Sequence, residues 1–452
     1  MSILIRDKAF YKRALGIMVP VTAQQIITVG VNLMDNIMVG QLEETAISGC
    51  SAASQIFDLF HFMILGLALG GNILTARFWG AQNREGVNKA ITLNYRFGIL
   101  LAALFTLVCA ITPRGIVSLF SSEADVIAEG IRYLNVSLPC FFLVACCTVT
   151  TTTLRNIKQL KVPLYTSIGA FFINIFFNWM FIFGKLGAPA MGVAGAALGT
   201  VISRIFEFVV MVGFLLFRDK NLQYDARNLF RLKCRNLMPE YLKISIPVMI
   251  SDTLLGLGSS VTVSIIGHMN KIYMSAYSIT AMVQRLSNVF MVGMSQASTL
   301  IIGNTLGAGE PEKAKKQGYT MAFIAACVGV VCSLIILAAG PFIISHYNIA
   351  DETKEIAWGF MSAVAVFSIF LYEAGVLTKG VLRGGGDTRF LMIADVLFLW
   401  VLCIPLGYLA AHVWSWPPFF LFMALRADHI MKIVLCLPRL VSGKWMKKIK
   451  VK

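Results

Sequence analysis

A single acidic residue interrupts the first long apolar run of the chain. Asp35 stands between Val31 and Gly40, and no Lys or Arg lies within a helical turn of it. A carboxylate in nonpolar surroundings needs a compensating partner. Asp35 is therefore expected to bind a cation, to carry a proton, or to accept a structural hydrogen bond from an Asn or Ser on a neighbouring helix.

Two asparagines occupy a later apolar run. Asn174 and Asn178 are four residues apart, which places both side chains on one face of a helix. Amide oxygens are good ligands for hard cations, so this face can contribute to a Na⁺ site.

The second half of the chain carries other acids in apolar runs. Asp252 and Glu373 are each expected to contact substrate or cation, or else to make a structural polar contact. Asp395 has no partner nearby in sequence, and its role stays open.

Some charges within apolar runs have a partner close in sequence. Arg204 and Glu207 are spaced i,i+3, and Asp428 and Lys432 are spaced i,i+4. Both spacings predict a local ion pair on one helix. Lys432 is also expected to extend its ammonium group toward the membrane surface.

The composition indicates what kind of elements must position these residues. The chain has 452 residues, of which 57% are hydrophobic and only 14% charged, and its mean hydropathy is +0.75. A membrane-spanning helix needs about 20 apolar residues. We predict an all-α polytopic membrane protein with twelve transmembrane helices, near residues 14–38, 52–76, 95–112, 131–153, 163–183, 191–217, 241–266, 279–303, 318–340, 356–379, 388–411 and 417–440.

The distribution of basic residues predicts the orientation. With both termini in the cytoplasm, 30 of the 39 Lys and Arg fall on the cytoplasmic side and five on the other. This bias is typical of multi-pass proteins of the inner or plasma membrane. The net charge of +16 is thereby explained without a nucleic-acid partner, because the basic residues lie in short loops between spans.

The two halves of the chain repeat each other. At an offset of 227 residues, Pro20 corresponds to Pro247 and Gly40 to Gly267. We predict two pseudo-symmetric six-helix lobes around a central cavity, with a cytoplasmic linker between them. The lobes are residues 1–217 and 241–452, the second with a basic cytoplasmic tail, and the linker is 218–240.

The equivalent prolines interrupt helical hydrogen bonding in the first and seventh spans. Pro20 and Pro247 each remove one backbone donor, so each predicts a bend. The bend is either a hinge that responds to cation binding or a static kink.

Four segments resemble motifs of a known family. In order along the chain they are Leu33–Gly40, Gly307–Lys316, Val381–Thr388 and Ser442–Trp445. Together they resemble the multidrug and toxic compound extrusion (MATE) transporters, a likeness that covers nearly the whole chain. It implies two six-helix lobes and export of amphipathic, often cationic compounds, driven by inward flow of H⁺ or Na⁺.

The resemblance also implies roles for individual residues. Asp35 occupies the position of a family coupling acid, and Asn174 and Asn178 occupy positions that support it. The possible Na⁺ site is thus Asp35, Asn174 and Asn178. Asp252 and Glu373 lie near, but not at, the positions of family acids in the seventh and tenth helices.

Other functions are less well supported by the sequence. A flippase for lipid-linked oligosaccharides would be expected to line its cavity with Arg and Lys, and only Arg204 and Arg285 are candidates. An enzyme is not expected, because no HExxH, GxSxG or P-loop motif is present. We expect no cofactor besides the coupling ion. The expected partners are small-molecule substrates and membrane lipids, and the protein is expected to be a monomer.

Overall fold

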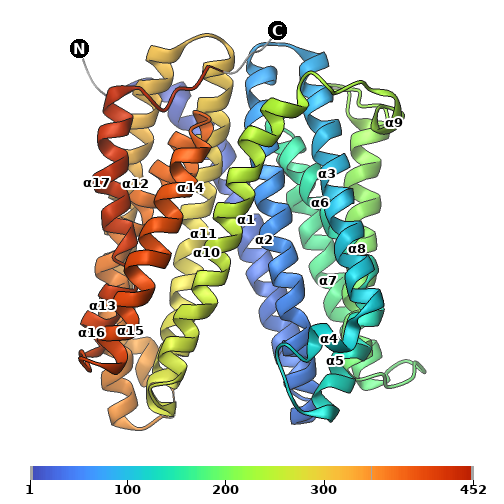
Figure 1. The fold of residues 1–452 in the computed structure, drawn as a ribbon, viewed down its shortest axis with the longest axis vertical. Helices are drawn as coiled ribbons and strands as arrows, with labels where there is room; N and C mark the ends of the chain where they lie inside the picture. Colours follow the sequence, from blue (N-terminus) through green and yellow to red (C-terminus); the bar gives the residue numbers. More distant parts are fainter. Residues whose placement is uncertain (1–3, 348, 449–452) are drawn as a thin grey trace. The chain divides into compact units, whose positions relative to one another are not determined.

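The computed structural model describes residues 4–347 and 349–448, and these are almost entirely helical (Figure 1). Within that part of the chain, ten helices are long and apolar enough to cross a membrane. Seven of them are single α-helices: α1 (Lys8–Val39), α2 (Glu44–Gly80), α3 (Arg84–Ile111), α7 (Lys161–Phe183), α10 (Met238–Gly267), α11 (Lys271–Gly307) and α12 (Pro311–Ser345). The chain is therefore a multi-pass membrane protein.

Three further spans contain a stretch of wider π-helix. They are α8 (Val193–Gly213) with η1 (Phe214–Arg218), α13 (Asp351–Gly375) with η2 (Val376–Leu382), and α14 (Thr388–Val396) with η3 (Leu397–Cys403) and α15 (Ile404–His412). Short π-helical stretches inside α-helices are often found at functional sites.

Two predicted spans are broken. The fourth consists of α5 (Ala124–Ser137) and α6 (Pro139–Asn156), which meet at an angle of 52°. Pro139 lacks a backbone donor and therefore interrupts the helical hydrogen bonds between α5 and α6, although Leu138 before it keeps helical backbone angles. The twelfth, predicted as one helix over 417–440, is divided into α16 (Pro418–Leu425) and α17 (Asp428–Ser442). With α5 and α6 counted as one span, the described residues contain eleven candidate spans, and α16 with α17 occupies the place of the predicted twelfth.

Shorter helices lie between the spans. α4 (Pro113–Val117) follows α3, and α9 (Asn228–Arg231) lies in the segment between α8 and α10.

The residues pack into two compact units, described separately below. The first comprises the chain up to Thr22, Ala76–Asn83 and the chain from Ile250 onward. The second comprises Ala23–Thr75 and Arg84–Met249. Helices α1 and α10 each contribute to both units, and they change unit after Thr22 and Met249, positions related by the repeat offset of 227. The predicted lobes 1–217 and 241–452 remain a prediction from the sequence repeat.

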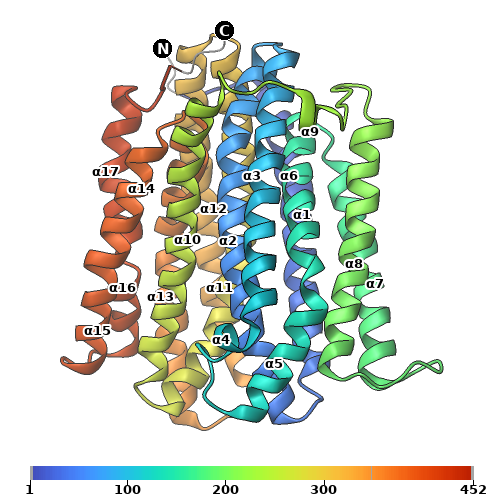
Figure 2. The same ribbon diagram turned by 45° about the vertical axis from the view of Figure 1, so that its right-hand side comes forward.

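In the second unit, α7 and α8 lie side by side (Figure 2). Two glycines of α8 permit this close approach. A β-carbon on Gly195 would meet the carbonyl oxygen of Phe181, and one on Gly199 would meet the side chain of Asn178. Small residues let membrane helices pack backbone to backbone.

In the first unit, the chain after α17 folds back onto the loop between η2 and α14. Trp445 is fully buried and donates from Nε1 to the carbonyl of Leu440 at 3.1 Å. Arg77 donates to the carbonyl of Gly385 at 2.9 Å, and Arg439 pairs with Asp387 at 2.6 Å. As far as Lys448, the predicted basic tail is thus a packed element of this unit.

Candidate functional site

The second unit brings Asp35 together with both asparagines. Asn178 of α7 donates from Nδ2 to Oδ1 of Asp35 on α1 at 2.6 Å. The same amide nitrogen lies 3.3 Å from Oδ1 of Asn174, one turn earlier on α7. Asp35 is partly exposed, and each asparagine is 1% exposed. The three side chains named from the sequence therefore form one polar cluster.

Two amide atoms of this cluster remain unpaired. Oδ1 of Asn178 and Nδ2 of Asn174 are buried and have no hydrogen-bond partner within the described residues. A buried polar atom without a partner is costly, so it marks a place where a ligand or water would be favourable. The site therefore offers the carboxylate of Asp35 and the amide oxygen of Asn174, while Asn178 presents its nitrogen to Asp35 and its oxygen to Gly199 of α8.

Apolar side chains surround the end of α1 at this site. Met38 and Val39 form a buried cluster with Ile182 of α7 and Ala196 of α8. This packing fixes the last turns of α1 against the helix that carries the asparagines. It also removes water from one side of Asp35, which strengthens any electrostatic interaction there.

Arg204 is the basic residue of this region. It pairs with Glu207 at 2.6 Å, as the i,i+3 spacing predicted, and it is close enough to interact electrostatically with Asp35. Because Glu207 balances its charge, Arg204 is poorly suited to hold a pyrophosphate, as the flippase alternative would require.

The first unit places Asp252 in an ion pair. Both carboxylate oxygens of Asp252 on α10 accept hydrogen bonds from Arg383, at 3.0 and 2.8 Å. Lys379 of η2 lies farther away, at 3.9 Å. The sequence did not identify Arg383 as this partner, because the two residues are 131 positions apart. A contact of Asp252 with substrate or cation stays a prediction from the sequence.

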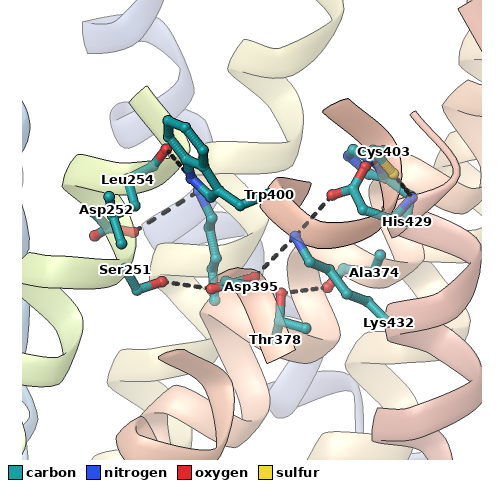
Figure 3. Close-up of polar contacts among 12 residues, drawn as sticks. Ser251, Asp252, Leu254, Ala374, Thr378, Asp395, Trp400, Cys403, His429 and Lys432 are labelled. Atoms are coloured by element: carbon teal, nitrogen blue, oxygen red, sulfur yellow. Dashed lines mark hydrogen bonds and ion pairs between the residues drawn. The ribbon is translucent and has the colours of Figure 1, made fainter. Parts of the chain in front are cut away.

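Asp395 is at the centre of a second group of charges (Figure 3). It accepts from Ser251 at 2.6 Å and from Lys432 at 2.8 Å. Lys432 also pairs with Asp428 at 2.8 Å, and Asp428 with His429 at 2.9 Å.

One expectation about this group was wrong. The Asp428–Lys432 pair forms as predicted, but Lys432 does not extend toward the membrane surface. Its side chain is buried, and its ammonium group bridges two carboxylates. Asp395, an acid without a local partner in sequence, provides the attraction that holds Lys432 inside.

The π-helical stretches adjoin this charged region. η2 carries Lys379, and η3 carries Trp400, which donates from Nε1 to the carbonyl of Leu254 on α10 at 3.1 Å (Figure 3). Cys403 at the end of η3 accepts from the backbone nitrogen of Asp428 at 3.0 Å. The widened turns thus help to connect α10, η3 and α17.

The second unit contains a related but less charged arrangement. Arg155 donates to Oε1 of Gln24 at 2.6 Å, and Gln24 donates to Oγ of Ser167 at 3.1 Å. At the offset of 227 that pairs Pro20 with Pro247, Gln24 corresponds to Ser251, and at an offset of 228 Arg155 and Ser167 correspond to Arg383 and Asp395. The contact of Gln24 with Ser167 thus recurs as that of Ser251 with Asp395, while Arg383 pairs with Asp252, the residue after Ser251.

The remaining predicted residues are less connected. Glu373 on α13 is half-buried, and its carboxylate has no ion pair or hydrogen bond with another described residue. Pro20 and Pro247 lie inside α1 and α10, both of which continue as helices past them.

A family model described as MatE matches the chain twice, over residues 20–180 and 247–409. The two matches begin at the equivalent prolines, Pro20 and Pro247, and together they cover most of the chain.

Curated relatives are similar over most of their length. A probable multidrug resistance protein NorM of Thermotoga maritima is 24% identical over 97% of this chain and 93% of its own. A probable multidrug resistance protein YoeA of Bacillus subtilis is 25% identical over 81% of this chain and 80% of its own.

Solved structures share the fold. A MATE in the straight conformation has a TM-score of 0.86 at 18% identity, covering 96% of both chains. An outward-facing multidrug resistance MATE family transporter has a TM-score of 0.85 at 18% identity, covering 98% of both chains.

Proposed function

Because the chain belongs to the MatE family, we propose that it is a secondary active multidrug antiporter. It exports amphipathic, often cationic organic compounds in exchange for inward H⁺ or Na⁺, as a monomer with both termini in the cytoplasm. Relatives named as multidrug resistance proteins, similar over most of their length, support export of such compounds. In this proposal the protein is a transporter and not an enzyme, and it needs no cofactor besides the coupling ion.

The contact between Asp35 and Asn178 carries the proposal. It joins the only acid in the second half of α1 to a helix of the same unit, in surroundings that are largely apolar. A charge buried in a membrane costs about 2.5–3.5 kcal/mol on insertion scales. Occupation by a cation or a proton removes that cost, so the site gains stability when loaded.

Both coupling ions fit the residues present. A proton would neutralise the Asp35 carboxylate. The protonated group could then donate a hydrogen bond to the amide oxygen of Asn178, instead of only accepting one from its nitrogen. A Na⁺ ion would be held by Asp35 with the amide oxygens of Asn174 and Asn178, once the Asn178 amide has rotated to turn its oxygen toward Asp35. Such oxygen atoms are the ligands that hard cations prefer.

Loading of this site can be transmitted along α1. Pro20 leaves the helix one backbone hydrogen bond short, two residues before α1 passes from the first unit into the second. Asp35 is on the same helix, within the second unit. A change in its contact with α7 would therefore change the bend of α1 at Pro20. Pro247 occupies the equivalent place in α10.

Transport by inverted membrane vesicles tests the proposal. Uptake of a fluorescent cationic compound is measured under an imposed pH gradient and, separately, an imposed Na⁺ gradient. The wild type is expected to respond to one of the two, and Asp35→Asn to neither. Asp125→Asn, which changes an exposed acid of α5, is the matched control and is expected to transport normally.

Two results would contradict the proposal. Transport that responds to neither gradient in the wild type would exclude H⁺ and Na⁺ coupling. Normal gradient-driven transport by Asp35→Asn would place the coupling site elsewhere, with Asp252 and Glu373 as the next candidates.

A further inference from the structure

The segment between the two sequence repeats is held firmly against α3. Arg96 of α3 donates from Nε to the carbonyl of Leu229 at 2.7 Å and from Nη2 to the carbonyl of Leu232 at 2.9 Å. Oη of Tyr224 lies 2.9 Å from Oγ1 of Thr92. Figure 2 shows α9, in the middle of this segment, at the end of the second unit where α3 begins. The segment is thus a folded surface and not a loose spacer.

The acidic groups of this segment are directed at its own backbone. Asp219 is buried and accepts from the backbone nitrogen of Leu222 at 2.8 Å. Oδ1 of Asp225 accepts from the backbone nitrogen of Arg227 at 2.8 Å. Burial raises the pKa of the Tyr224 phenol to about 12, so this group stays neutral. The acidic groups are therefore engaged in forming turns.

The basic groups, in contrast, all point outward. Six Lys and Arg side chains of this segment are exposed, and none has an ion pair or side-chain hydrogen bond within the described residues. They are Arg218, Lys220, Arg227, Arg231, Lys233 and Arg235. Exposed Lys and Arg elsewhere in the described chain are paired in a few cases, as Lys313 is with Glu310, so this segment is distinguished by how closely its basic groups are spaced. An unpaired group of six basic side chains is available to an anionic partner.

Two phenylalanines are exposed beside these charges. Phe217 is 87% exposed and Phe230 is 85% exposed. Phe217 belongs to η1, the last turn of a membrane span, and Phe230 belongs to α9. Next to η1, a depression of about 670 Å³ is lined by residues that include Phe217, Arg218, Lys220 and Tyr224. Apolar rings and basic groups therefore share one surface that begins where a membrane span ends.

We propose that this surface, residues 217–235, binds the headgroups of anionic phospholipids. Phosphate oxygens would accept from Arg218 and Lys220 at the depression, while Phe217 and Phe230 enter the boundary between headgroups and acyl chains. Aromatic residues favour that boundary, and basic residues next to it are attracted to anionic lipid. A soluble polyanion would explain the charges but not the exposed rings at the end of a span.

Lipid binding to the full-length purified protein tests the proposal. Native mass spectrometry counts bound lipid after addition of phosphatidylglycerol and phosphatidylcholine with the same acyl chains. The wild type is expected to retain phosphatidylglycerol preferentially. R218Q/K220Q/R227Q is expected to lose about a hundredfold in affinity for it, given a contribution of about fivefold for each of three basic residues near an anionic surface.

A matched variant distinguishes lipid binding at residues 217–235 from non-specific attraction of anionic lipid to basic side chains. K313Q/K315Q/K316Q removes the same number of charges from the start of α12 and is expected to keep the preference. F217S/F230S is expected to weaken binding of phosphatidylglycerol without any loss of charge. Unfolding temperatures of the variants in residues 217–235 should match the wild type, because the changed side chains are exposed and without ion pairs or side-chain hydrogen bonds within the described residues. The α12 variant should change little, because it loses only the exposed ion pair of Lys313 with Glu310.

Three outcomes would overturn the proposal. Equal losses in the two charge variants would mean that no specific surface exists. Displacement of the lipid by inorganic phosphate at similar concentrations would indicate a site for a free anion. Displacement by an oligonucleotide, together with unchanged lipid binding by F217S/F230S, would indicate a soluble polyanion as the partner.

Discussion

Individual charged residues of this protein are stabilised by partners on other helices. Asp252 illustrates the point, because both of its oxygens are occupied by Arg383. Because the positive charge of Arg383 cancels that of the carboxylate, Asp252 attracts a cationic substrate only weakly. Glu373 has no such partner among the described residues. Of the two acids predicted in the second half of the chain, it is therefore the better candidate for attracting cationic substrates.

The Asp252–Arg383 pair predicts a specific pattern of stability. Arg383→Met leaves the buried Asp252 without its partner and should lower the free energy of unfolding by about 3–5 kcal/mol. The double variant D252L/R383M removes both charges and should be considerably more stable than R383M. Thermal unfolding in detergent measures both.

The double variant also serves as the control for the pair. A double variant no more stable than R383M would mean that the damage comes from lost packing rather than from an unpaired charge.

At the scale of the element, the site depends on how closely α7 and α8 approach. Gly199 of α8 lies against the Oδ1 side of Asn178, the residue that donates to Asp35. The helix that carries the partner of Asp35, the proposed coupling acid, is thus itself positioned by a glycine on a third helix. The sequence around Asp35 and Asn178 does not show that their contact depends on Gly199.

Substitution of Gly199 should therefore affect transport as well as stability. Gly199→Ala places a methyl group on Asn178 and is expected to cost about 1–3 kcal/mol and to weaken the Asp35 contact. Gly213→Ala, on the same helix but with open space around its β-carbon, should be neutral or slightly stabilising.

Unfolding temperature and gradient-driven transport distinguish the two glycine variants. If Gly199→Ala transports like Gly213→Ala, then the close approach of α7 and α8 is not needed to position Asn178.

At the scale of the whole molecule, two copies of one helical scaffold have acquired different chemistry. Arg155 donates to the neutral amide of Gln24, whereas its counterpart Arg383 forms an ion pair with Asp252. Asp35 has no acidic counterpart, because Thr262 stands at the equivalent position. The two units are therefore not interchangeable.

The predicted orientation can be measured directly. In a background in which the exposed Cys327 is replaced by Ser, cysteines at Glu43 and Asp351 should react with a membrane-impermeant thiol reagent added outside. A cysteine at Lys316 should react only after permeabilisation. The reason is the basic bias, which keeps Lys- and Arg-rich loops in the cytoplasm.

The reverse labelling pattern would show that the topology is inverted. In that case the surface formed by residues 217–235 would face the other leaflet.

The sequence by itself determined the features that depend on neighbours along the chain. Long apolar runs predicted the spans, and Gly and Pro at a constant offset predicted the repeat that the two family matches confirm. The Arg204–Glu207 and Asp428–Lys432 pairs followed from helical spacing alone. Asp35 could be identified because an acid is conspicuous in an apolar run.

Only the tertiary structure decided which distant side chains meet. Helical spacing shows which residues share a face, but it does not show which helix lies opposite that face. Arg383 as the partner of Asp252, and Lys432 as the partner of Asp395, both needed helices from separate parts of the chain to pack together. In a nonpolar interior such attractions outweigh the local preference, and this is why Lys432 turns inward instead of toward the membrane surface.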